Sequence, residues 1–418
     1  MAHRRVGYRA GMSEEIAYPA LYLKRNEDTR LRAGHLWVFS NEVDVKRSPL
    51  TGFEPGEPCI VVDAHDKPLG VGYANPNSLI AARLVNRGIA HPLDRSLLVH
   101  KLNVALSLRQ RLYAEPCYRL VFGESDGLPG LTVDRFGDVI VAQTTTAGME
   151  RLKDDIAAAL VKVLKPAALV WKNDAGSRAM EQLPEYADIG YGELRAPVFA
   201  REGGLEFEID VIGGQKTGWF YDQRANRDLL APTGSNSLVR GLRVLDMFSY
   251  LGGWGLRAAA AGAREVVCVD ASAAAVEAIA RNAARNGLGD TVSALKADAF
   301  EHLKALRETR ERFDVVILDP PAFVKRKKDF AEGRLAYRRI NEMAMQILAR
   351  DGILITCSCS YHMPRAALLE AVQQGARHLD RNVQVLAQLQ QAPDHPVHPA
   401  IPETDYLKGF ICRVLPAQ

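Results

Sequence analysis

The chain has 418 residues, of which 47% are hydrophobic and 25% are charged, and its formal net charge is +3. This length predicts two or three domains, and the composition excludes a disordered majority. The 6 cysteines are too scattered for a disulfide framework or a paired metal motif, so we expect a reducing cytoplasm and no metal site. No stretch reaches the ~18 apolar residues of a membrane helix, so we expect no membrane partner.

The N-terminal segment is basic but lacks the apolar core of a signal peptide, so export is not expected. Residues 1–11 are expected to form a tail, with translation starting at Met1 or at Met12. Residues 20–90 contain short apolar runs broken by glycine, proline and asparagine, which predict a small β-barrel or sandwich. Residues 92–113 then show apolar positions three and four apart, as in an amphipathic connecting helix.

Residues 118–146 predict hairpin strands around glycine and proline turns, and residues 149–165 predict a helix. Further strands are expected at residues 168–174 and 193–201. This β-β-α-β-β order predicts a second, small α+β domain.

Residues 205–230 predict a hairpin and then a helix that begins near Asp222. Gln223 and Arg224 at its start are candidates to bind a ligand carboxylate, because a planar guanidinium binds carboxylates at two points. The alternative for Arg224 is a salt bridge on the helix surface.

Five apolar runs between residues 242 and 360 end in residues that can take part in chemistry. They are "LRVLDMFSYLGG", "VVCVDAS", "ALKADAF", "FDVVILDPPAF" and "GILITCSCS". In an open α/β sheet, ligands bind outside the carboxyl ends of the strands, which is where these residues would lie. The order fits an enzyme that binds S-adenosyl-L-methionine and places a cysteine beside the methyl donor.

The first run ends at Asp246 and continues into a turn that begins at Phe248 and contains Gly252 and Gly253. Glycines let the backbone approach a ligand that a side chain would block. The turn lacks the G-x-G-x-x-G spacing of dinucleotide enzymes, so the small zwitterionic methionine part of the cofactor is the better fit.

The second run ends at Asp270, which is placed to accept hydrogen bonds from the ribose hydroxyls of a nucleoside. The third ends at Asp298, a candidate partner for the adenine amino group. The alternative for each single aspartate is the N-cap of a helix. Three aspartates at equivalent strand ends favour the cofactor site.

The fourth run ends in Asp319, Pro320 and Pro321. Two consecutive prolines fix the backbone and remove two donors, so the segment leaves the sheet as a stiff ledge beside the substrate. Methyltransferases that modify exocyclic amino groups usually have an aromatic residue directly after the second proline. Here Ala322 precedes Phe323, which counts against an amino-group target.

A basic cluster follows this ledge and consists of Lys325, Arg326, Lys327 and Lys328. Binding to phosphates depends on such local clusters rather than on the total charge, so we predict that this one contacts RNA. The alternative is an ordinary solvated face.

The fifth run places Cys357 and Cys359 two residues apart, on one face if the strand geometry persists. We expect a nucleophilic thiolate here, and the alternative is a small buried hydrophobic residue. Residues 383–399 and 406–415 predict two last strands with a long excursion between them, the antiparallel end of a methyltransferase sheet.

With these motifs together, the chain resembles the ribosomal RNA large-subunit methyltransferase I family, cytosine carbon-5 enzymes with a PUA domain. The matching segments are "GHLWVFSNEV", "GESDGLPGLTVDRFGD", "GQKTGWFYDQR", "FSYLGG", "DPPAFVK", "SCS" and "DHPV...YLKGFICRVL". The resemblance implies a multidomain α/β protein. Its parts would be a PUA-like RNA-binding barrel at 18–92, a helical connector with a small α+β domain at 93–200, and a Rossmann-like class I methyltransferase domain at 201–418.

The resemblance assigns the cofactor to Asp246, Gly252, Asp270, Asp298 and Asp319, and the nucleophile to Cys359. Many relatives have no cysteine at the position of Cys357, so this chain offers two candidates. The implied product is 5-methylcytosine in large-subunit ribosomal RNA, formed through a covalent cysteine adduct while Asp319 holds the ring at nitrogen 3.

Other functions stay open at this stage. The first is an RNA methyltransferase for another position, such as guanine nitrogen 7, that needs no covalent nucleophile. The others are a non-catalytic RNA-binding protein that keeps the cofactor fold and a nicotinamide oxidoreductase. The sequence also leaves open a homodimer and the identity of the modified nucleotide.

Overall fold

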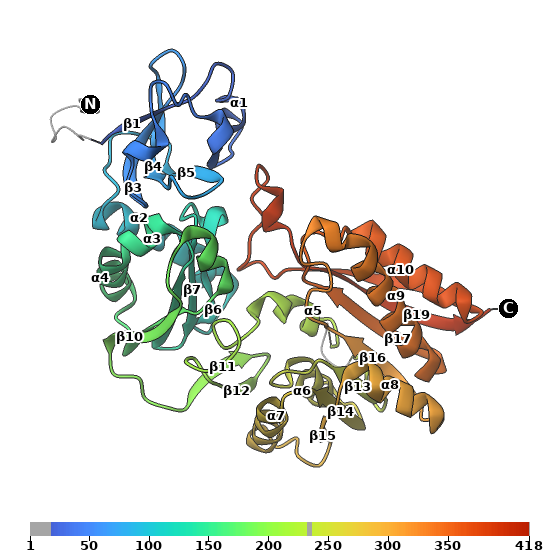
Figure 1. Cartoon of the computed structure of the whole chain (residues 1–418). Helices are drawn as coiled ribbons and strands as arrows, with labels where there is room; N and C mark the ends of the chain where they lie inside the picture. The colour runs from blue at the N-terminus through green and yellow to red at the C-terminus, as the bar shows by residue number, and fades with distance from the viewer. Residues whose placement is uncertain (1–17, 232–235, 418) are drawn as a thin grey trace. The chain divides into compact units, whose positions relative to one another are not determined.

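The computed structural model describes residues 18–231 and 236–417 (Figure 1). Residues 1–11, where we expect a tail, lie outside the described residues. So do Met1 and Met12, the two candidate start positions. Contacts divide the chain into two units. The first contains the described residues up to Val198 together with Asp210–Trp219 and Asp394–Thr404, and the second contains the rest.

The first unit begins with a five-stranded sheet in the order β1-β3-β4-β5-β2. Its elements are β1 (Ala20–Tyr22), α1 (Thr29–Arg32), β2 (Trp37–Phe39), β3 (Glu57–Val62), β4 (Pro68–Ala74) and β5 (Ile80–Asn86). Only β1 and β3 pair in parallel, and the other neighbours are antiparallel. The short strands predicted between residues 20 and 90 are present.

A second five-stranded sheet follows, in the order β10-β9-β8-β7-β6. Its strands are β6 (Cys117–Phe122), β7 (Leu131–Phe136), β8 (Val139–Thr144), β9 (Ala168–Asn173) and β10 (Tyr186–Gly192), and its helices are α2 (Arg95–Leu112), α3 (Ala147–Arg151) and α4 (Lys153–Leu164). The connecting helix α2 starts where Asp94 caps it, because the Asp94 carboxylate accepts a 2.9 Å hydrogen bond from the Leu97 backbone N–H.

The two sheets of the first unit share one hydrophobic core. Val62 and Tyr73 from the first sheet belong to the same buried cluster as Leu120, Ile140 and residues of α2 and α4. The Tyr73 hydroxyl donates a 2.7 Å hydrogen bond to the Pro129 carbonyl, which lies just before β7. The boundary predicted at residues 92/93 therefore crosses a continuous core, and the division into separate domains stays a prediction.

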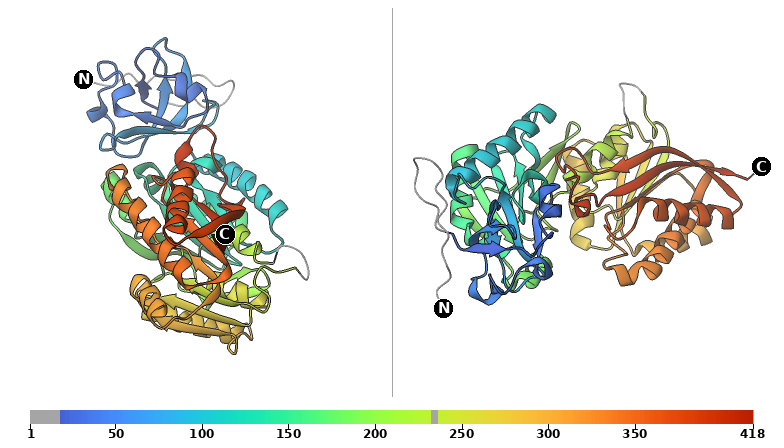
Figure 2. Two further views of the ribbon diagram at one scale, coloured as in Figure 1. Left: turned by 90° about the vertical axis from the view of Figure 1, so that its right-hand side faces the viewer. Right: turned by 90° about the horizontal axis from the view of Figure 1, so that it is seen from above.

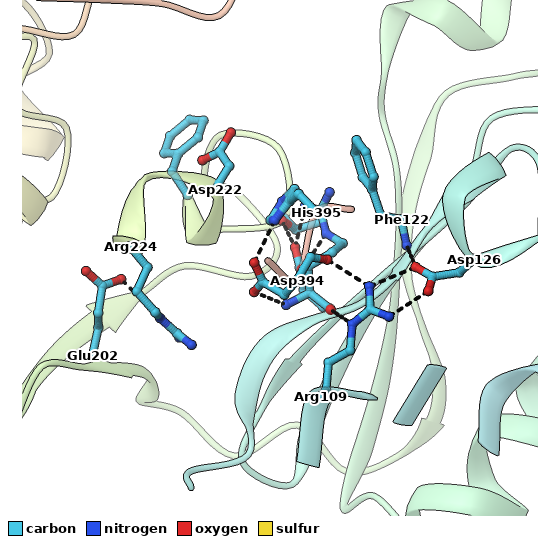
Figure 3. Close-up of polar contacts among 12 residues, drawn as sticks. Arg109, Phe122, Asp126, Glu202, Asp222, Arg224, Asp394 and His395 are labelled. Carbon is cyan, nitrogen blue, oxygen red and sulfur yellow. Dashed lines mark hydrogen bonds and ion pairs between the residues drawn. The ribbon is translucent and has the colours of Figure 1, made fainter. Parts of the chain in front are cut away.

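A buried arginine ties the distant segment Asp394–Thr404 to the second sheet (Figure 3). Arg109 on α2 is fully buried and binds both oxygens of Asp126, at 2.6 and 2.8 Å. Its Nη2 also donates a 2.8 Å hydrogen bond to the Asp394 carbonyl. The Asp394 carboxylate in turn accepts a 3.0 Å hydrogen bond from the Arg119 backbone N–H on β6.

The second unit is built on a seven-stranded sheet in the order β15-β14-β13-β16-β17-β19-β18 (Figure 1). Its strands are β13 (Arg243–Met247), β14 (Glu265–Asp270), β15 (Val292–Lys296), β16 (Phe313–Leu318), β17 (Leu348–Ser358), β18 (Arg381–Gln390) and β19 (Lys408–Pro416). The strands β13 to β17 run parallel, and β19 is antiparallel to both neighbours. The antiparallel end predicted for this sheet is present.

Helices cover both faces of the seven-stranded sheet. They are α5 (Arg224–Asp228), α6 (Gly253–Ala260), α7 (Ala273–Arg285), α8 (Ala299–Glu308), α9 (Phe330–Ile347) and α10 (Arg365–His378). The helices α8, α9 and α10 pack on one face in a single core with Leu245, Val316 and Phe410 of the sheet, and α9 and α10 run side by side (Figure 2). The helices α6 and α7 contact β13, β14 and β15 from the other face.

The strand order places a topological switch point between β13 and β16. From β13 the chain moves first to β14 and β15, and then returns to add β16 and β17 on the other side. Ligands bind at the carboxyl ends of the strands flanking such a point, because the connections diverge there. Among the described residues, no helix is long and apolar enough to cross a membrane.

The structure differs from the predicted elements between residues 174 and 202. The strand expected at 193–201 appears as β11 (Val198–Glu202), which pairs with β12 (Leu205–Ile209) in a separate two-stranded sheet. Apart from Val198, both strands belong to the second unit. The last strand of the middle sheet is β10, which the sequence did not predict. Gly190 in β10 weakens the strand pattern but is required there, because a Cβ would lie 2.3 Å from Trp171 Nε1.

Candidate active site

Asp246 is the second-last residue of β13, which flanks the switch point, and it is fully buried. Its Oδ2 accepts a 2.9 Å hydrogen bond from the Gly255 backbone N–H. Its Oδ1 has no hydrogen-bond partner among the described residues. Burial, together with the charges of Asp319 and Asp270, raises the pKa of Asp246 to about 7. This carboxylate is therefore suited to a ligand that brings a hydrogen-bond donor or a positive charge.

The turn after β13 is held in an unusual backbone conformation. Phe248 has φ 63° and Tyr250 has φ 50°, which lie in the left-handed region that residues other than glycine rarely adopt. Gly252, with φ 83°, is the N-cap of α6. Gly255 lies so close to β14 that a Cβ would be 2.2 Å from Cys268 Sγ. The predicted glycine turn thus brings the start of α6 against Asp246, and its role in cofactor binding stays a prediction.

Asp270 and Asp298 follow the two neighbouring strands but have different surroundings. Asp270 accepts 2.9 Å hydrogen bonds from the backbone N–H groups of Tyr250 and Ser272, one on each oxygen, and is partly exposed. Asp298 is exposed and caps α8, where its Oδ1 accepts from the N–H groups of Phe300 and Glu301. The capping alternative is therefore observed for Asp298, whose contact with adenine stays a prediction.

Asp319 lies directly after β16, on the other side of the switch point. Its Oδ2 accepts hydrogen bonds from Gln223 Nε2 at 2.9 Å and from Trp254 Nε1 at 3.2 Å. Burial and the charge of Asp222 raise the pKa of Asp319 to about 6. This carboxyl group can therefore hold or release a proton near neutral pH.

The two residues predicted to bind a ligand carboxylate have partners within the protein. Gln223 donates to Asp319 and accepts a 2.6 Å hydrogen bond from Asn226 Nδ2, so the structure places it beside Asp319. Arg224 Nε lies 3.8 Å from Glu202 Oε2 (Figure 3). The ion pair considered for Arg224 is thus present, although it is buried rather than on a helix surface.

The two cysteines of the fifth run differ in exposure. Cys357 lies within β17, opposite Gly409 of β19, and its exposure is 0%. Burial raises the pKa of Cys357 well above the ordinary value, so it stays a neutral thiol. Cys359 is partly exposed and follows the end of β17 at Ser358. The condition for both cysteines to lie on one strand face is not met, because the strand ends between them.

The serines on either side of Cys359 anchor its loop to other elements. Ser358 Oγ donates a 2.8 Å hydrogen bond to the Tyr337 hydroxyl on α9. Ser360 Oγ donates to the carbonyl of Val324, in the segment that follows the two prolines. The loop that carries Cys359 is therefore fixed to the predicted substrate ledge. Sequence analysis missed Tyr337, because no local motif links it to a loop some twenty positions later.

The four residues of the basic cluster, Lys325, Arg326, Lys327 and Lys328, are all exposed. Arg326 Nε contacts Asp329 Oδ2 at 3.1 Å within a short turn before α9. The cluster is available to phosphates of a nucleic acid, and its role stays a prediction. Across residues 18–231 and 236–417, no group of three or more His, Cys, Asp or Glu side chains could hold a metal ion.

Two known families match parts of the chain. Residues 21–87 match a PUA-like domain, and residues 191–408 match an S-adenosylmethionine-dependent methyltransferase. The ribosomal RNA large subunit methyltransferase I of Shewanella denitrificans is 37% identical over 400 residues, which cover 94% of this chain and 98% of the relative. The protein of the same name from Vibrio cholerae is 36% identical over 405 residues, 95% of this chain and 100% of the relative.

Two solved structures share the fold over nearly the whole chain. A putative methyltransferase in complex with SAH has a TM-score of 0.80 at 20% identity, covering 94% of this chain and 99% of that chain. A putative SAM-dependent methyltransferase from Streptococcus mutans has a TM-score of 0.78 at 20% identity with the same coverage. At this identity the likeness concerns the fold.

Proposed function

Because the chain belongs to the ribosomal RNA large-subunit methyltransferase I family, we propose that it methylates carbon 5 of a cytosine in large-subunit ribosomal RNA. The observation that carries this proposal is that Cys359 and Asp319 follow the neighbouring strands β17 and β16. A partly exposed thiol on a fixed loop stands after β17, and a carboxyl group with a raised pKa stands after the neighbouring strand β16. An attacking sulfur and a proton-holding group are the two parts that a covalent cytosine mechanism needs.

The acidic residues at the switch point fit the cofactor of this family. S-adenosyl-L-methionine supplies an electrophilic methyl group, and it carries positive charge on its sulfonium and ammonium groups. Asp246 offers a buried oxygen that has no hydrogen-bond partner among the described residues. Asp246, Asp270 and Asp319 are close enough for the charges of the latter two to raise the pKa of Asp246. We assign the methionine part to Asp246 and the turn at Gly252 and Gly253, and the ribose to Asp270.

The residues of this chain then act in a fixed order on the base. The Cys359 thiolate bonds to carbon 6 of cytosine, and the electron pair of the carbon 5–carbon 6 double bond makes carbon 5 nucleophilic. Asp319 holds the proton at nitrogen 3, which favours this addition. Carbon 5 would then take the methyl group as its bond to the sulfonium sulfur of the cofactor breaks. Carbon 5 next loses its hydrogen as a proton to water, the carbon 5–carbon 6 double bond re-forms, and the bond between carbon 6 and the Cys359 sulfur breaks to return the thiolate.

The target base must be unpaired or flipped out of a helix to reach this loop, at a cost of a few kcal/mol. We assign the binding energy that offsets this cost to RNA contacts of the PUA-like region and of the Lys325–Lys328 cluster. The exposed position of that cluster, in the segment after the proline ledge, supports this assignment.

The test uses an RNA substrate that contains 5-fluorocytosine. Fluorine cannot leave carbon 5 as a proton does, so the enzyme should remain bound in a denaturant-resistant adduct. Mass spectrometry of the adduct should place the link at Cys359. Cys359→Ala should lose both adduct and methylation, and Cys357→Ala is the matched control that should keep both.

The outcomes separate the rival functions. A link at Cys357 would show that the assigned nucleophile is wrong. Methylation of RNA without an adduct would point to another base position, such as guanine nitrogen 7. Failure to bind S-adenosyl-L-methionine in calorimetry would leave a non-catalytic RNA-binding protein.

A further inference from the structure

Lys408, on a neighbouring strand, contacts the residue before Cys359 and the residue after it. Lys408 is the first residue of β19 and pairs with Ser358 in the register of β17 and β19. Its Nζ donates a 2.7 Å hydrogen bond to the carbonyl oxygen of Ser360. The residues before and after Cys359 are therefore both fixed by Lys408, one through strand pairing and one through the side chain.

The ammonium group of Lys408 is buried without a close negative partner. The residue is 5% exposed, and among the described residues it forms no ion pair with a carboxylate. Burial lowers the pKa of Lys408 to about 8, while the charges of Asp405 and of a Cys359 thiolate act in the opposite direction. A buried cation is costly unless it is compensated, and the charges of Asp405 and of a Cys359 thiolate both favour the protonated form of Lys408.

We propose that Lys408 is a positioning residue for the covalent step, which keeps the Cys359 sulfur as a thiolate beside its ammonium group and fixes the loop between Ser358 and Ser360. This rests on the proposed function, in which Cys359 is the nucleophile. A neighbouring cation lowers the pKa of a thiol because it favours the charged form. The thiol proton passes to water, and Lys408 stays protonated throughout.

The other titratable groups around this thiol do not replace Lys408. The charges of Cys359 and Asp319 act on Tyr337 of α9 and on Cys357 of β17. Arg365 of α10 and Asp405, which precedes β19, act on Lys408. Burial raises the pKa of Tyr337 to about 12, so its hydroxyl is neutral, as is the Cys357 thiol. The carboxylates of Asp319 and Asp405 cannot stabilise a thiolate, because they carry charge of the same sign. Arg365 is the second cation, and its Nη1 donates to the Leu389 carbonyl at 2.8 Å.

The experiment measures how fast iodoacetamide alkylates Cys359 between pH 6 and pH 8, in the absence of RNA. The other cysteines are buried, so the reaction should be selective; they are Cys59, Cys117, Cys268, Cys357 and Cys412. Only the thiolate reacts, so the rate follows the ionised fraction. We expect Lys408→Met to raise the apparent pKa of the thiol by about one pH unit, which is a ~10-fold slower reaction at pH 7.

Two further variants separate the charge from the hydrogen bond. Lys408→Gln keeps a donor for the Ser360 carbonyl but has no charge, and it should react as slowly as Lys408→Met. Lys408→Arg keeps the charge and should restore most of the wild-type rate. If Lys408→Gln alkylates with the wild-type pH profile, Lys408 only supports the loop and the proposal is overturned. Unchanged affinity for S-adenosyl-L-methionine identifies variants that are correctly folded.

This result is independent of the adduct experiment. If Lys408 controls the thiol pKa but the wild type forms no adduct with 5-fluorocytosine RNA, the proposed function fails while the lysine–thiolate pair stands. If the adduct forms and the thiol pKa is the same in Lys408→Met, the proposed function stands and the role of Lys408 is rejected.

Discussion

At the scale of single residues, the buried environment of Asp246 disfavours the ionised form of its carboxyl group. Its pKa is raised to about 7, chiefly by burial, so the folded protein favours the protonated carboxyl. For a group whose pKa is raised by folding, the folded protein is most stable, relative to the unfolded chain, below the ordinary pKa of about 4. This stability is lost as the pH rises from there through about 7, because the buried carboxyl group must then ionise. Without a ligand, ionised Asp246 therefore destabilises the folded protein at neutral pH, and a positively charged ligand at this carboxylate would offset that cost.

Asp246→Asn should remove this cost, because the amide is neutral at every pH. We expect the ligand-free variant to be more stable than the wild type at pH 8, by on the order of 1–3 kcal/mol, and the difference to vanish near pH 4. Denaturant unfolding at the two pH values measures it. Asp298→Asn, which alters an exposed capping carboxylate, is the control. Parallel pH profiles for wild type and Asp246→Asn would contradict the prediction.

The same carboxylates predict the pH dependence of cofactor binding. The affinity of the wild type for S-adenosyl-L-methionine should rise from pH 5.5 to pH 7.5, as Asp319 (pKa about 6) and Asp246 (pKa about 7) lose their protons. Asp246→Asn should bind more weakly and lose most of this rise. Calorimetry at several pH values decides, and an affinity that is independent of pH in the wild type would reject the assignment of these groups to the cofactor.

Residue types at strand ends could be predicted, and their partners could not. Asp246, Asp270 and Asp319 follow from apolar runs that end in an acid, and the structure places them at the carboxyl ends of adjacent strands. That Gln223 donates to Asp319, or that Lys408 reaches Ser360, depends on pairings across many positions of the chain. No spacing within one segment encodes such contacts.

At the scale of elements, the start of α6 is positioned by the absence of a side chain at Gly255. In Gly255→Ala the new Cβ would lie 2.2 Å from Cys268 Sγ and 3.1 Å from Asp246 Oδ2. We expect the helix to shift away from β14, with a stability loss of about 1–3 kcal/mol and weaker cofactor binding. Gly289→Ala, where the nearest atom is 4.0 Å away, is the control for melting and calorimetry. Equal effects in both variants would contradict a local steric cause.

The basic cluster gives a prediction about RNA. Replacing Lys325, Arg326, Lys327 and Lys328 together by glutamine should weaken RNA binding and flatten its dependence on salt, because each lost phosphate contact lowers that slope. Cofactor affinity should not change. Replacing the exposed Arg307 and Arg310 by glutamine, a loss of two charges rather than four, tests whether charge lost elsewhere has a similar effect. A salt slope equal to that of the wild type would make the cluster an ordinary solvated face.

The elements themselves were predictable where the apolar pattern was regular. The alternating and continuous apolar runs of β13, β14 and β16 identified the sheet, and the fold class and family are confirmed. The edge strand β10 was missed because its side chains are mostly exposed and Gly190 and Gly192 interrupt it. An edge strand with one partner needs little apolar surface, so it leaves little pattern in the sequence.

At the scale of the whole molecule, the first unit should unfold as one body because its two sheets share a core. Tyr73→Phe removes the hydrogen bond to the Pro129 carbonyl and the 2.9 Å contact with Thr146 Oγ1. We expect a loss of about 1–3 kcal/mol. Hydrogen exchange should speed up together in β4 and in β7, and Tyr191→Phe, at an exposed tyrosine, is the control. Faster exchange in the first sheet alone would indicate two independent domains.

The contact units also constrain how the protein can be made. The chain passes from one unit to the other after Val198, Ile209, Trp219, Pro393 and Thr404. The first unit is therefore incomplete until Asp394–Thr404 has been synthesised, and only then does Arg109 obtain the Asp394 carbonyl as an acceptor. The contacts that Asp394–Thr404 makes with the first unit can therefore form only after almost the whole chain has been translated, and a protein truncated before Asp394 would lack them.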